Sequence, residues 1–370
     1  MRTFVAIVGF VALLVLGLLY YMSPATALEP EMPKQANIAN ETTEETETVG
    51  QAAVPTSAEQ ADVLATMESR SAAKNQVWVG TFQLVWNDFI NELLKAPARF
   101  LAEQPVMADE LNKQSFTEAE LSEDAYYKKW GLASIQLKKE IEQGISQKFN
   151  ETSDILDQFD WTPIAGKYFL YAMLKKDFQF AEPFADLGKD SFKGSANTVT
   201  YFGADNDKQK RSIWVLFYKN RNNFAVRLNS KQDDHVYLYR TDNPGTLAKL
   251  YQDMKQEILA YNGSNALQEE DHFKAPMLDL DVTKSFTEIT GKVISPNWII
   301  AQAIETIKFK MNESGVELKS EAAVMTLKMS ASVGALPRYF DFNARYVVFL
   351  AEKGKKPYFA LLVEDAAVLQ

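Results

Sequence analysis

The residues of this sequence that can do chemistry are few, and the histidines among them lie in two short acidic stretches. His235 ends the stretch Asp233–His235, and His272 ends the stretch Glu269–His272. Imidazole and carboxylate groups placed this close together are ligands for divalent metals. Both stretches lie in polar turns, however, where solvated charge is the commoner explanation. With only two histidines in the chain, we expect no metal site.

A further pair of carboxylates, Asp279 and Asp281, has the spacing of an acid–base element. Leu278 and Leu280 alternate with them, so the pattern favours a strand whose polar residues face water. The sequence contains no G-x-S-x-G, P-loop, G-x-G-x-x-G or H-E-x-x-H motif. It contains no cysteine, which excludes thiolate catalysis and disulfides. We therefore expect neither an enzyme nor a cofactor.

Composition restricts the class of partner. The formal net charge of −10 argues against nucleic acid and against an anionic membrane surface, because binding to either needs clustered Lys and Arg. The chain has 370 residues, of which 46% are hydrophobic, and can bury a sizeable core. Composition thus favours another protein as the partner over either of these.

The N-terminus indicates export. Residues 4–22 form an apolar run after Arg2, and Ala25 and Ala27 give the small-x-small pattern of a signal-peptidase site. The run is also long enough to approach a membrane span, so 1–27 is a cleaved signal peptide or a retained anchor. Either places the protein outside the cytoplasm: secreted, periplasmic or on the outer surface. Contact with a membrane is expected only through this segment.

The next part of the chain, 28–70, reads as an acidic linker. It is rich in Ala, Thr, Glu, Gln and Pro and has no aromatic residue. Such a segment cannot bury enough apolar surface to offset its ordering entropy, so we expect it to be disordered.

Residues 71–370 show the periodicities of a folded domain. Apolar residues recur at helical spacing in 82–104, 133–150 and 243–261. Strand patterns fill 167–174, 197–203, 212–220, 223–230, 235–240, 274–286 and 306–312, and 346–365 reads as a terminal β-hairpin. Helices first and strands later predict one α+β domain with mainly antiparallel sheets, and we expect a monomer.

One segment near the C-terminus, 312–337, combines a strand with an unusually apolar loop. Val316, Leu318, Ser320, Ala322 and Val324 alternate with residues that are mostly charged. From Met325 to Leu336 the only charge is Lys328, which is unusual for a soluble loop. The segment therefore predicts a strand followed by a piece that another protein meets.

In their order along the chain, the segments from about Glu140 to the C-terminus resemble a serpin. The stretch 145–156 is similar to the end of the helix that crosses the main serpin sheet. Residues 167–184 resemble the family's central strand, with Phe180 where tryptophan is usual and Pro183–Phe184 at the family's spacing. The strands of 212–240, the segment 273–294 and the final hairpin also match in order. Residues 71–139 do not carry the resemblance. It implies a serpin-like fold.

Serpins offer a loop as bait, and after cleavage the loop enters a sheet as an extra strand and distorts the bound protease. The resemblance permits two alignments of this loop. If Gly315 is the hinge glycine, the bait bond is Met329-Ser330. If Ser320, Glu321, Ala322 and Ala323 are the hinge, the bait bond lies near Val333-Gly334.

The alternation of 316–326 leaves a third interpretation open. A strand with one uncharged face is expected of a segment already resident in a half-buried sheet, paired as a hairpin with 306–312. Such a protein would not act by the trap and would bind a partner through Lys328–Leu336. The two functions that the sequence leaves open are therefore a suicide inhibitor of serine or cysteine proteases and a non-inhibitory serpin-like binding or structural protein.

Overall fold

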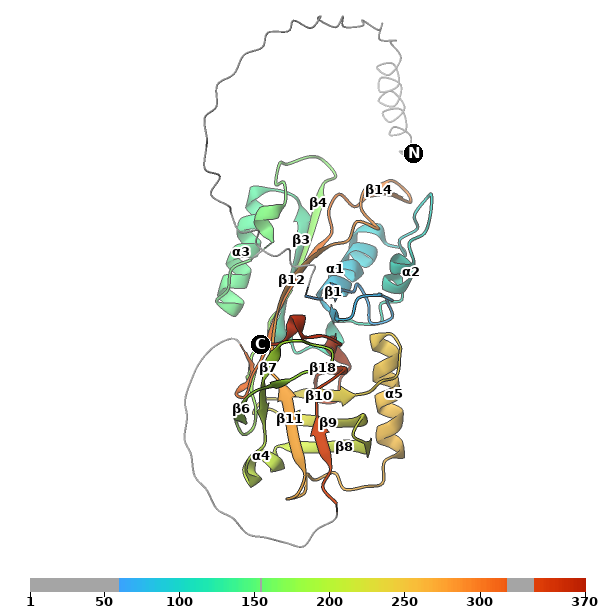
Figure 1. The fold of residues 1–370 in the computed structure, drawn as a ribbon. Helices are drawn as coiled ribbons and strands as arrows, with labels where there is room; N and C mark the ends of the chain where they lie inside the picture. The colour runs from blue at the N-terminus through green and yellow to red at the C-terminus, as the bar shows by residue number, and fades with distance from the viewer. Residues whose placement is uncertain (1–59, 154, 318–335) are drawn as a thin grey trace, which may run out of the picture. The chain divides into compact units, whose positions relative to one another are not determined.

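The computed structural model describes residues 60–153, 155–317 and 336–370 (Figure 1). Over these ranges the α+β class predicted from the sequence is confirmed: the sheets are mainly antiparallel, three of the five α-helices precede β4, and a β-hairpin lies near the C-terminus. The signal or anchor at 1–27 and most of the expected linker lie outside the described residues.

The largest sheet has seven strands in the order β1-β2-β19-β18-β10-β9-β8. All neighbours are antiparallel except β1 and β2. Their bounds are Asp62–Val63, Gln76–Val79, Pro357–Val363, Tyr346–Glu352, Asp234–Arg240, Asn223–Asn229 and Ile213–Asn220. Every residue of β18 and β19 is buried, because the hairpin lies in the middle of the sheet rather than at its edge.

A second sheet has the order β17-β11-β7-β6, with β17 and β11 parallel. Its strands are Tyr339–Asp341, His272–Pro276, Thr198–Gly203 and Ala185–Ser191. The edge strand β17 follows the undescribed residues 318–335, so this sheet holds the C-terminal end of the predicted loop.

The third sheet has the order β12-β15-β16-β5 and is antiparallel throughout. Its strands are Leu278–Ser285, Ile304–Met311, Gly315–Glu317 and Phe178–Gln179. Two further pairs are β3 with β4, Tyr126–Leu132 and Tyr168–Leu174, and β13 with β14, Val293–Ile294 and Trp298–Ile299.

Five α-helices occur in the described ranges: α1 Thr81–Asp88, α2 Val106–Asn112, α3 Ile135–Phe149, α4 Asp207–Arg211 and α5 Leu247–Ala260. A π-helical turn at Phe89–Leu94 extends α1, as the apolar spacing of 82–104 predicted. Short 3-10 turns lie at Glu118–Glu120, Glu123–Ala125, Leu156–Gln158 and Ala366–Val368. The hydroxyls of Ser134 and Thr246 cap α3 and α5 by accepting from backbone N–H groups of their first turns.

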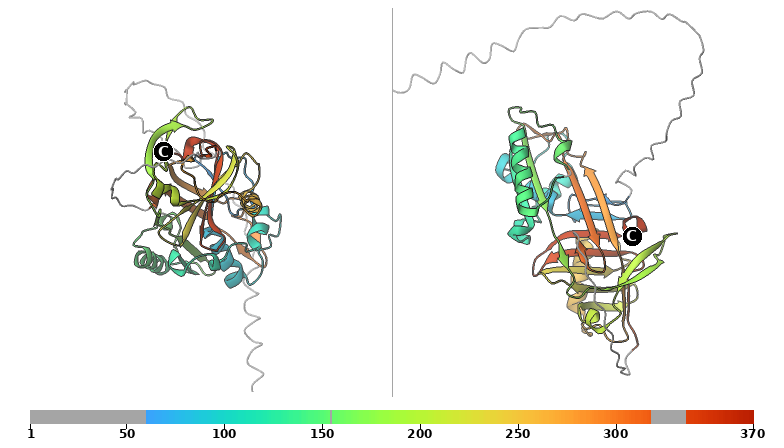
Figure 2. Two further views of the ribbon diagram at one scale, coloured as in Figure 1. Left: turned by 90° about the horizontal axis from the view of Figure 1, so that it is seen from below. Right: turned by 90° about the vertical axis from the view of Figure 1, so that its left-hand side faces the viewer.

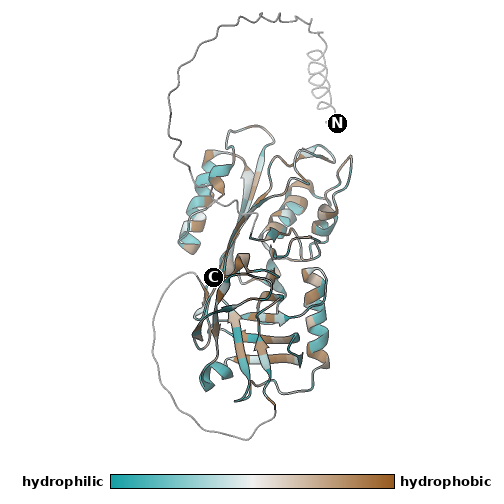
Figure 3. Ribbon diagram, viewed as in Figure 1, coloured by the Kyte–Doolittle hydropathy of each residue, from teal (hydrophilic) through white to brown (hydrophobic). Residues whose placement is uncertain are grey.

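Two clusters of buried apolar residues pack the helices against the sheets. The main cluster joins the large sheet to α1, α2 and α5. A smaller one packs Leu137, Ile141 and Ile145 of α3 against Tyr171 of β4. Figure 2 shows α3 beside the β3–β4 pair, and Figure 3 shows hydrophobic and hydrophilic residues alternating along α3 and α5. This alternation is expected of amphipathic helices that cover a sheet.

The expected boundary between linker and domain at residue 70 needs correction. β1 pairs with β2, and Val63 and Leu64 are only 3% and 4% exposed. The folded domain therefore includes residues before 71. The four apolar residues Ala61, Val63, Leu64 and Ala65 are too few to show a period in the sequence, and most of the apolar cluster that they join comes from residues far along the chain.

Candidate functional site

The turn that joins β15 to β16 is built on Asn312. Its side-chain Oδ1 accepts from the backbone N–H of Ser314 at 2.9 Å and of Gly315 at 3.2 Å. The backbone N–H of Asn312 donates to the Gly315 carbonyl at 3.0 Å. Asn suits this position because its short side chain bonds the backbone two residues on. The predicted hairpin thus begins as expected over Gly315–Glu317, and its remainder lies outside the described residues.

Gly315 lies where β16 enters between β15 and β5. A Cβ atom on this residue would stand 2.4 Å from the Phe178 carbonyl oxygen and 2.8 Å from the Gln179 Cα. Both are backbone atoms of β5 and cannot move aside as the end of a side chain would. Glycine is therefore the residue that permits the pairing of Gly315 with Gln179 and of Val316 with Phe178.

Beyond β16 the sheet opens. Within the described ranges, the strand pairing of β15 on the side away from β12 involves only Lys310 and Met311. Residues of β4 lie across a cavity from β15, and β4 pairs with β3 along its whole length. β4 and β5 belong to one chain segment, so this segment lies against β16 at one end and diverges from β15 at the other.

The space between β4 and β15, which we call the slot, is a cavity of about 580 Å³. Its lining is mainly apolar and includes residues of α1, the π-helical turn after it, β4, β15 and β19: Phe82, Val85, Trp86, Phe89, Leu170, Ala172, Leu174, Ile307, Phe309 and Phe359. Leu170, Ala172 and Leu174 pack toward the main core, whereas Tyr171 packs with α3 on the opposite face of β4. An extended segment entering the slot would therefore meet apolar residues on its core side.

A buried ion-pair cluster fixes the chain where the slot begins. Lys176, between β4 and β5, lies 2.6 Å from Glu352 Oε1 and 3.1 Å from Asp234 Oδ1. Burial alone would raise the pKa of Glu352, but hydrogen bonds from Lys176, Ser122 and Lys355 outweigh it and lower the pKa to about 2. The link between β4 and β5 is thus held to the large sheet while β4 itself stands apart from β15.

One carboxylate lines the slot. Glu305 of β15 is 4% exposed, and its Oε1 accepts from the Thr81 hydroxyl at 2.6 Å and from the Phe82 N–H at 3.2 Å. Its Oε2 is buried without a hydrogen-bond partner in the described structure. Burial raises the pKa of Glu305 to about 8 against the two donors, which lower it.

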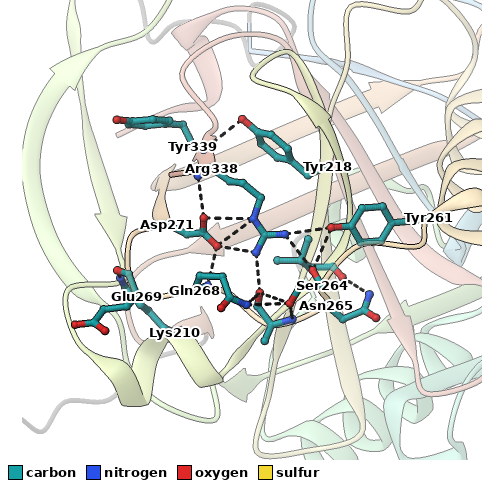
Figure 4. Close-up of polar contacts among 12 residues, drawn as sticks. Lys210, Tyr218, Tyr261, Ser264, Asn265, Gln268, Glu269, Asp271, Arg338 and Tyr339 are labelled. Carbon is teal, nitrogen blue, oxygen red and sulfur yellow. Dashed lines mark hydrogen bonds and ion pairs between the residues drawn. The ribbon is translucent and has the colours of Figure 1, made fainter. Parts of the chain in front are cut away.

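The far end of the predicted loop is anchored by Arg338 (Figure 4). Its guanidinium lies 2.7 Å from Asp271 Oδ2, and the backbone N–H of Arg338 donates to Asp271 Oδ1 at 2.8 Å. The guanidinium also donates to the Tyr261 hydroxyl and to the Ser264 and Ala266 carbonyls, at 2.7–3.1 Å. Burial alone would raise the pKa of Asp271, but hydrogen bonds from the Arg338 side chain and from the backbone N–H groups of Gln268 and Arg338 outweigh it and hold the pKa below its ordinary value.

The next residue, Tyr339, strengthens the same anchor. The Arg221 guanidinium lies 3.7 Å from the centroid of its ring, and the His272 ring stacks on it at 4.8 Å. Phe340, one residue further, is fully buried. The edge strand β17 is therefore fixed by side chains as well as by its short ladder with β11.

The structure places one of the predicted site residues. Gly315 of the expected hinge lies at the head of β16. The remaining hinge residues Ser320, Glu321, Ala322 and Ala323, and the loop residues Lys328, Met329, Ser330, Val333 and Gly334, lie outside the described residues. What the structure adds is the two ends of this segment, one paired in the third sheet and one in the second.

Sequence reasoning missed Glu305, Arg338 and Asp271. For Glu305 a signal was present: it shares the alternation of Ile307, Phe309 and Met311, so it faces the core with them. No comparable signal marks the Arg338–Asp271 pair, because 67 residues separate the partners and each reads as an ordinary surface charge.

The carboxylate pair that the sequence offered for acid–base chemistry forms ion pairs with lysines in the structure. Asp279 and Asp281 of β12 lie 3.0 Å from Lys310 and 3.8 Å from Lys308, on the polar side of the strand that the alternation predicted. In the part of the chain that the structure describes, no group of three His, Asp or Glu residues could hold a metal ion. No helix within these ranges is long and apolar enough to cross a membrane.

Comparison with known proteins gives a likeness of fold. No protein-family model matches the sequence, and no curated protein matches it. Among solved structures, the highly specific Serpin48 of the insect Tenebrio molitor is 13% identical over 80% of this chain and 93% of its own, with a TM-score of 0.48. Human thyroxine-binding globulin in complex with its ligand is 10% identical over 77% of this chain and 95% of its own, with a TM-score of 0.43. The mouse protein Z-dependent protease inhibitor is 15% identical over 64% of this chain and 63% of its own, with a TM-score of 0.40.

Solved serpins are thus among the structures that this chain is similar to, as the resemblance in its sequence predicted. The likeness concerns the course of the chain alone.

Proposed function

We propose that this protein is an exported, serpin-like inhibitor of serine or cysteine proteases. In this proposal residues 318–335 are the bait, and the part of the bait before the cleaved bond enters the slot as an added strand. The observation that carries the proposal is the slot itself: an apolar cavity of about 580 Å³ between β4 and β15, headed by the three-residue strand β16.

The register of β16 supports entry in a particular alignment. Val316 pairs with Met311, and the next residue pairs with Lys310. Continued without a shift, this ladder sets Leu318 opposite Phe309, Ser320 opposite Ile307 and Ala322 opposite Glu305. Residues opposite each other in an antiparallel ladder share a face, so the uncharged residues of the segment would meet the buried face of β15.

The charged residues of the segment would then fall on the other face. Lys319 would stand opposite Lys308, whose ammonium is 3.8 Å from Asp281, and Glu321 would stand opposite Thr306. Charge in the hinge is therefore compatible with insertion, since this alignment keeps it away from the core.

The position of Gly315 favours one of the two bait bonds. It heads β16 in the way expected of a hinge glycine, which supports the alignment with Met329-Ser330 as the bait bond rather than Val333-Gly334. The protease partner would meet this bond from outside the cytoplasm, with residues 1–27 serving as signal or anchor.

One observation favours the second candidate function, that of a non-inhibitory protein. The Asn312 turn and its three hydrogen bonds make a hairpin that needs no cleavage to form. If residues 318–326 always continue this hairpin, the slot is filled from the start. The protein is then a non-inhibitory binding or structural protein.

Cleavage within Lys328–Gly334 separates the two functions. If the slot is empty before cleavage, a nicked protein should melt tens of degrees above the intact one, because the freed strand completes a sheet and buries apolar surface. Incubation with trypsin-like, elastase-like and subtilisin-like proteases should also yield an SDS-resistant covalent complex.

A matched pair of variants sharpens the test. Ser320→Arg would place a charge against Ile307 and should abolish both the rise in melting temperature and the covalent complex. Glu321→Arg changes the outward face and should retain both. An unchanged melting temperature in the nicked wild-type protein would rule out the trap and favour the resident strand.

A further inference from the structure

Glu305 is a buried titratable group that strand insertion itself does not require. It lies on the core face of β15 between positions that are apolar, and it bounds the slot. One carboxylate oxygen is bonded at the N-terminus of α1, and the other has no partner in the described structure. An ionised carboxylate in this position would leave a charged oxygen without a donor, which is costly away from water.

The charged groups on the neighbouring elements do not compensate this carboxylate. Lys284, opposite Glu305 on β12, is held by Asp62 of β1 at 2.9 Å. Asp88, at the far end of α1, is paired with Lys128 of β3 at 2.6 Å. On the slot side, the residues of β4 that pack toward the same core are Leu170, Ala172 and Leu174. Burial therefore raises the pKa of Glu305 to about 8.

The slot is the adjacent space from which an ionised Glu305 can take water. Filling the slot removes that space and sets a strand beside the carboxylate. A filled slot is therefore compatible with protonated Glu305 and is destabilised by ionised Glu305, whereas an open slot allows water to hydrate the ionised carboxylate.

We propose that Glu305 is a proton-controlled gate on the slot: the slot accepts a strand when Glu305 is protonated and resists it when Glu305 is ionised. The gate rests on the proposed function, because it presupposes that a strand enters the slot.

The size of the effect follows from the protonated fraction. A group with a pKa of about 8 is about 90% protonated at pH 7 and about 10% at pH 9, so strand uptake should slow about tenfold between these pH values.

The probe for the test is a fluorescent synthetic peptide with the sequence of residues 316–326. Its N-terminus is acetylated, because a free α-amino group would titrate near pH 8, and its side-chain charges come from Glu and Lys, which do not titrate between pH 7 and 9. Uptake by the full-length protein is followed by fluorescence anisotropy from pH 6 to 9.5. The wild-type rate should fall about tenfold with a midpoint near pH 8, and Glu305→Gln should take up the peptide at a rate independent of pH.

Two further variants make the test specific. Thr81→Val removes a donor that lowers the pKa of Glu305, so it should move the midpoint to higher pH even if Glu305→Gln fails to fold. Asp281→Asn makes the same carboxylate-to-amide change on the exposed side of β12 and should keep the wild-type profile.

The outcomes separate the gate from the proposed function. Equal uptake at pH 7 and pH 9 by the wild-type protein would overturn the gate while strand acceptance survives. A pH dependence that persists in Glu305→Gln would also overturn it. No uptake by any variant at any pH would reject strand acceptance, and the gate with it.

Discussion

Glu305 shows how a single residue can link the stability of this fold to pH. Its folded pKa of about 8 lies above the ordinary value of 4.5. Between these pH values the folded protein holds a proton that the unfolded chain has released. The free energy of unfolding therefore falls as pH rises from 4.5 to 8, and it is constant above that range with respect to this group.

The first prediction follows from this sign. The wild-type protein should lose up to about 1.4 kcal/mol of unfolding free energy per pH unit relative to the Glu305→Gln variant between pH 5 and 8. Urea unfolding of both proteins at several pH values measures the difference. Asp281→Asn serves as the control: it changes an exposed carboxylate and retains Glu305, so its curve should run parallel to that of the wild type. Parallel curves for the wild type and Glu305→Gln would show that Glu305 does not titrate in this range.

Arg338 illustrates a different use of charge. Its planar guanidinium satisfies Asp271, Tyr261 and two carbonyls at once, and a lysine at the same position has no geometry that reaches all of them. The pair therefore acts as a clamp on the start of β17 rather than as an ordinary surface ion pair.

The second prediction concerns this clamp. Arg338→Lys should cost on the order of 1–3 kcal/mol of unfolding free energy and increase amide exchange in residues 338–341, because buried polar atoms lose their donors. Lys113→Ala is the control: Lys113 forms a surface ion pair with Glu110, and its loss should leave the free energy of unfolding nearly unchanged. Equal effects of the two substitutions would contradict the clamp.

At the scale of elements, the slot depends on the contact between β16 and β5. β16 can approach β5 only because residue 315 has no side chain. The Asn312 turn then sets the register in which the following residues run along β15. A three-residue strand and a tight turn thus decide where any longer strand would begin.

The third prediction tests this contact. Gly315→Ala should separate β16 from β5, cost about 1–3 kcal/mol and raise amide exchange at Phe178 and Val316, because the added methyl group meets backbone. Gly131→Ala is the matched control: its Cβ would stand at an ordinary 3.4 Å from a side-chain atom of Leu137. It should leave exchange at Phe178 and Val316 unchanged. The contact proposed for Gly315 is refuted if both variants exchange alike.

At the scale of the whole molecule, the body starts earlier than composition indicates. Ala61, Val63, Leu64 and Ala65 belong to the main apolar cluster, and Asp62 pairs with Lys284 of β12. The first described residues thus connect the large sheet to the third sheet, next to Glu305.

The fourth prediction is a comparison of two shortened chains. A chain that begins at Ser71 should unfold with on the order of 3–6 kcal/mol less free energy than one that begins at Gln60, from the loss of buried Val63, Leu64 and two alanines. Urea unfolding followed by tryptophan fluorescence measures it. Identical midpoints would mean that residues 60–70 contribute no packing.

The sequence by itself determined the periodic elements. The helices at α1, α3 and α5, the strands from β7 to β10 and the terminal hairpin all follow from spacing and turn residues that act within a few positions. These local patterns, in their order, also sufficed for the α+β class and for the resemblance to serpins.

Tertiary structure alone decided what these elements form together. The slot exists because β4 stays with β3 and α3 while β15 stays with β12, a choice between long-range partners that no local pattern encodes. The clamp of Arg338 on Asp271 and the isolation of Glu305 are likewise set by residues far apart in the chain. Periodicity reports which face of an element is buried, whereas packing decides what that face is buried against, and the site depends on the latter.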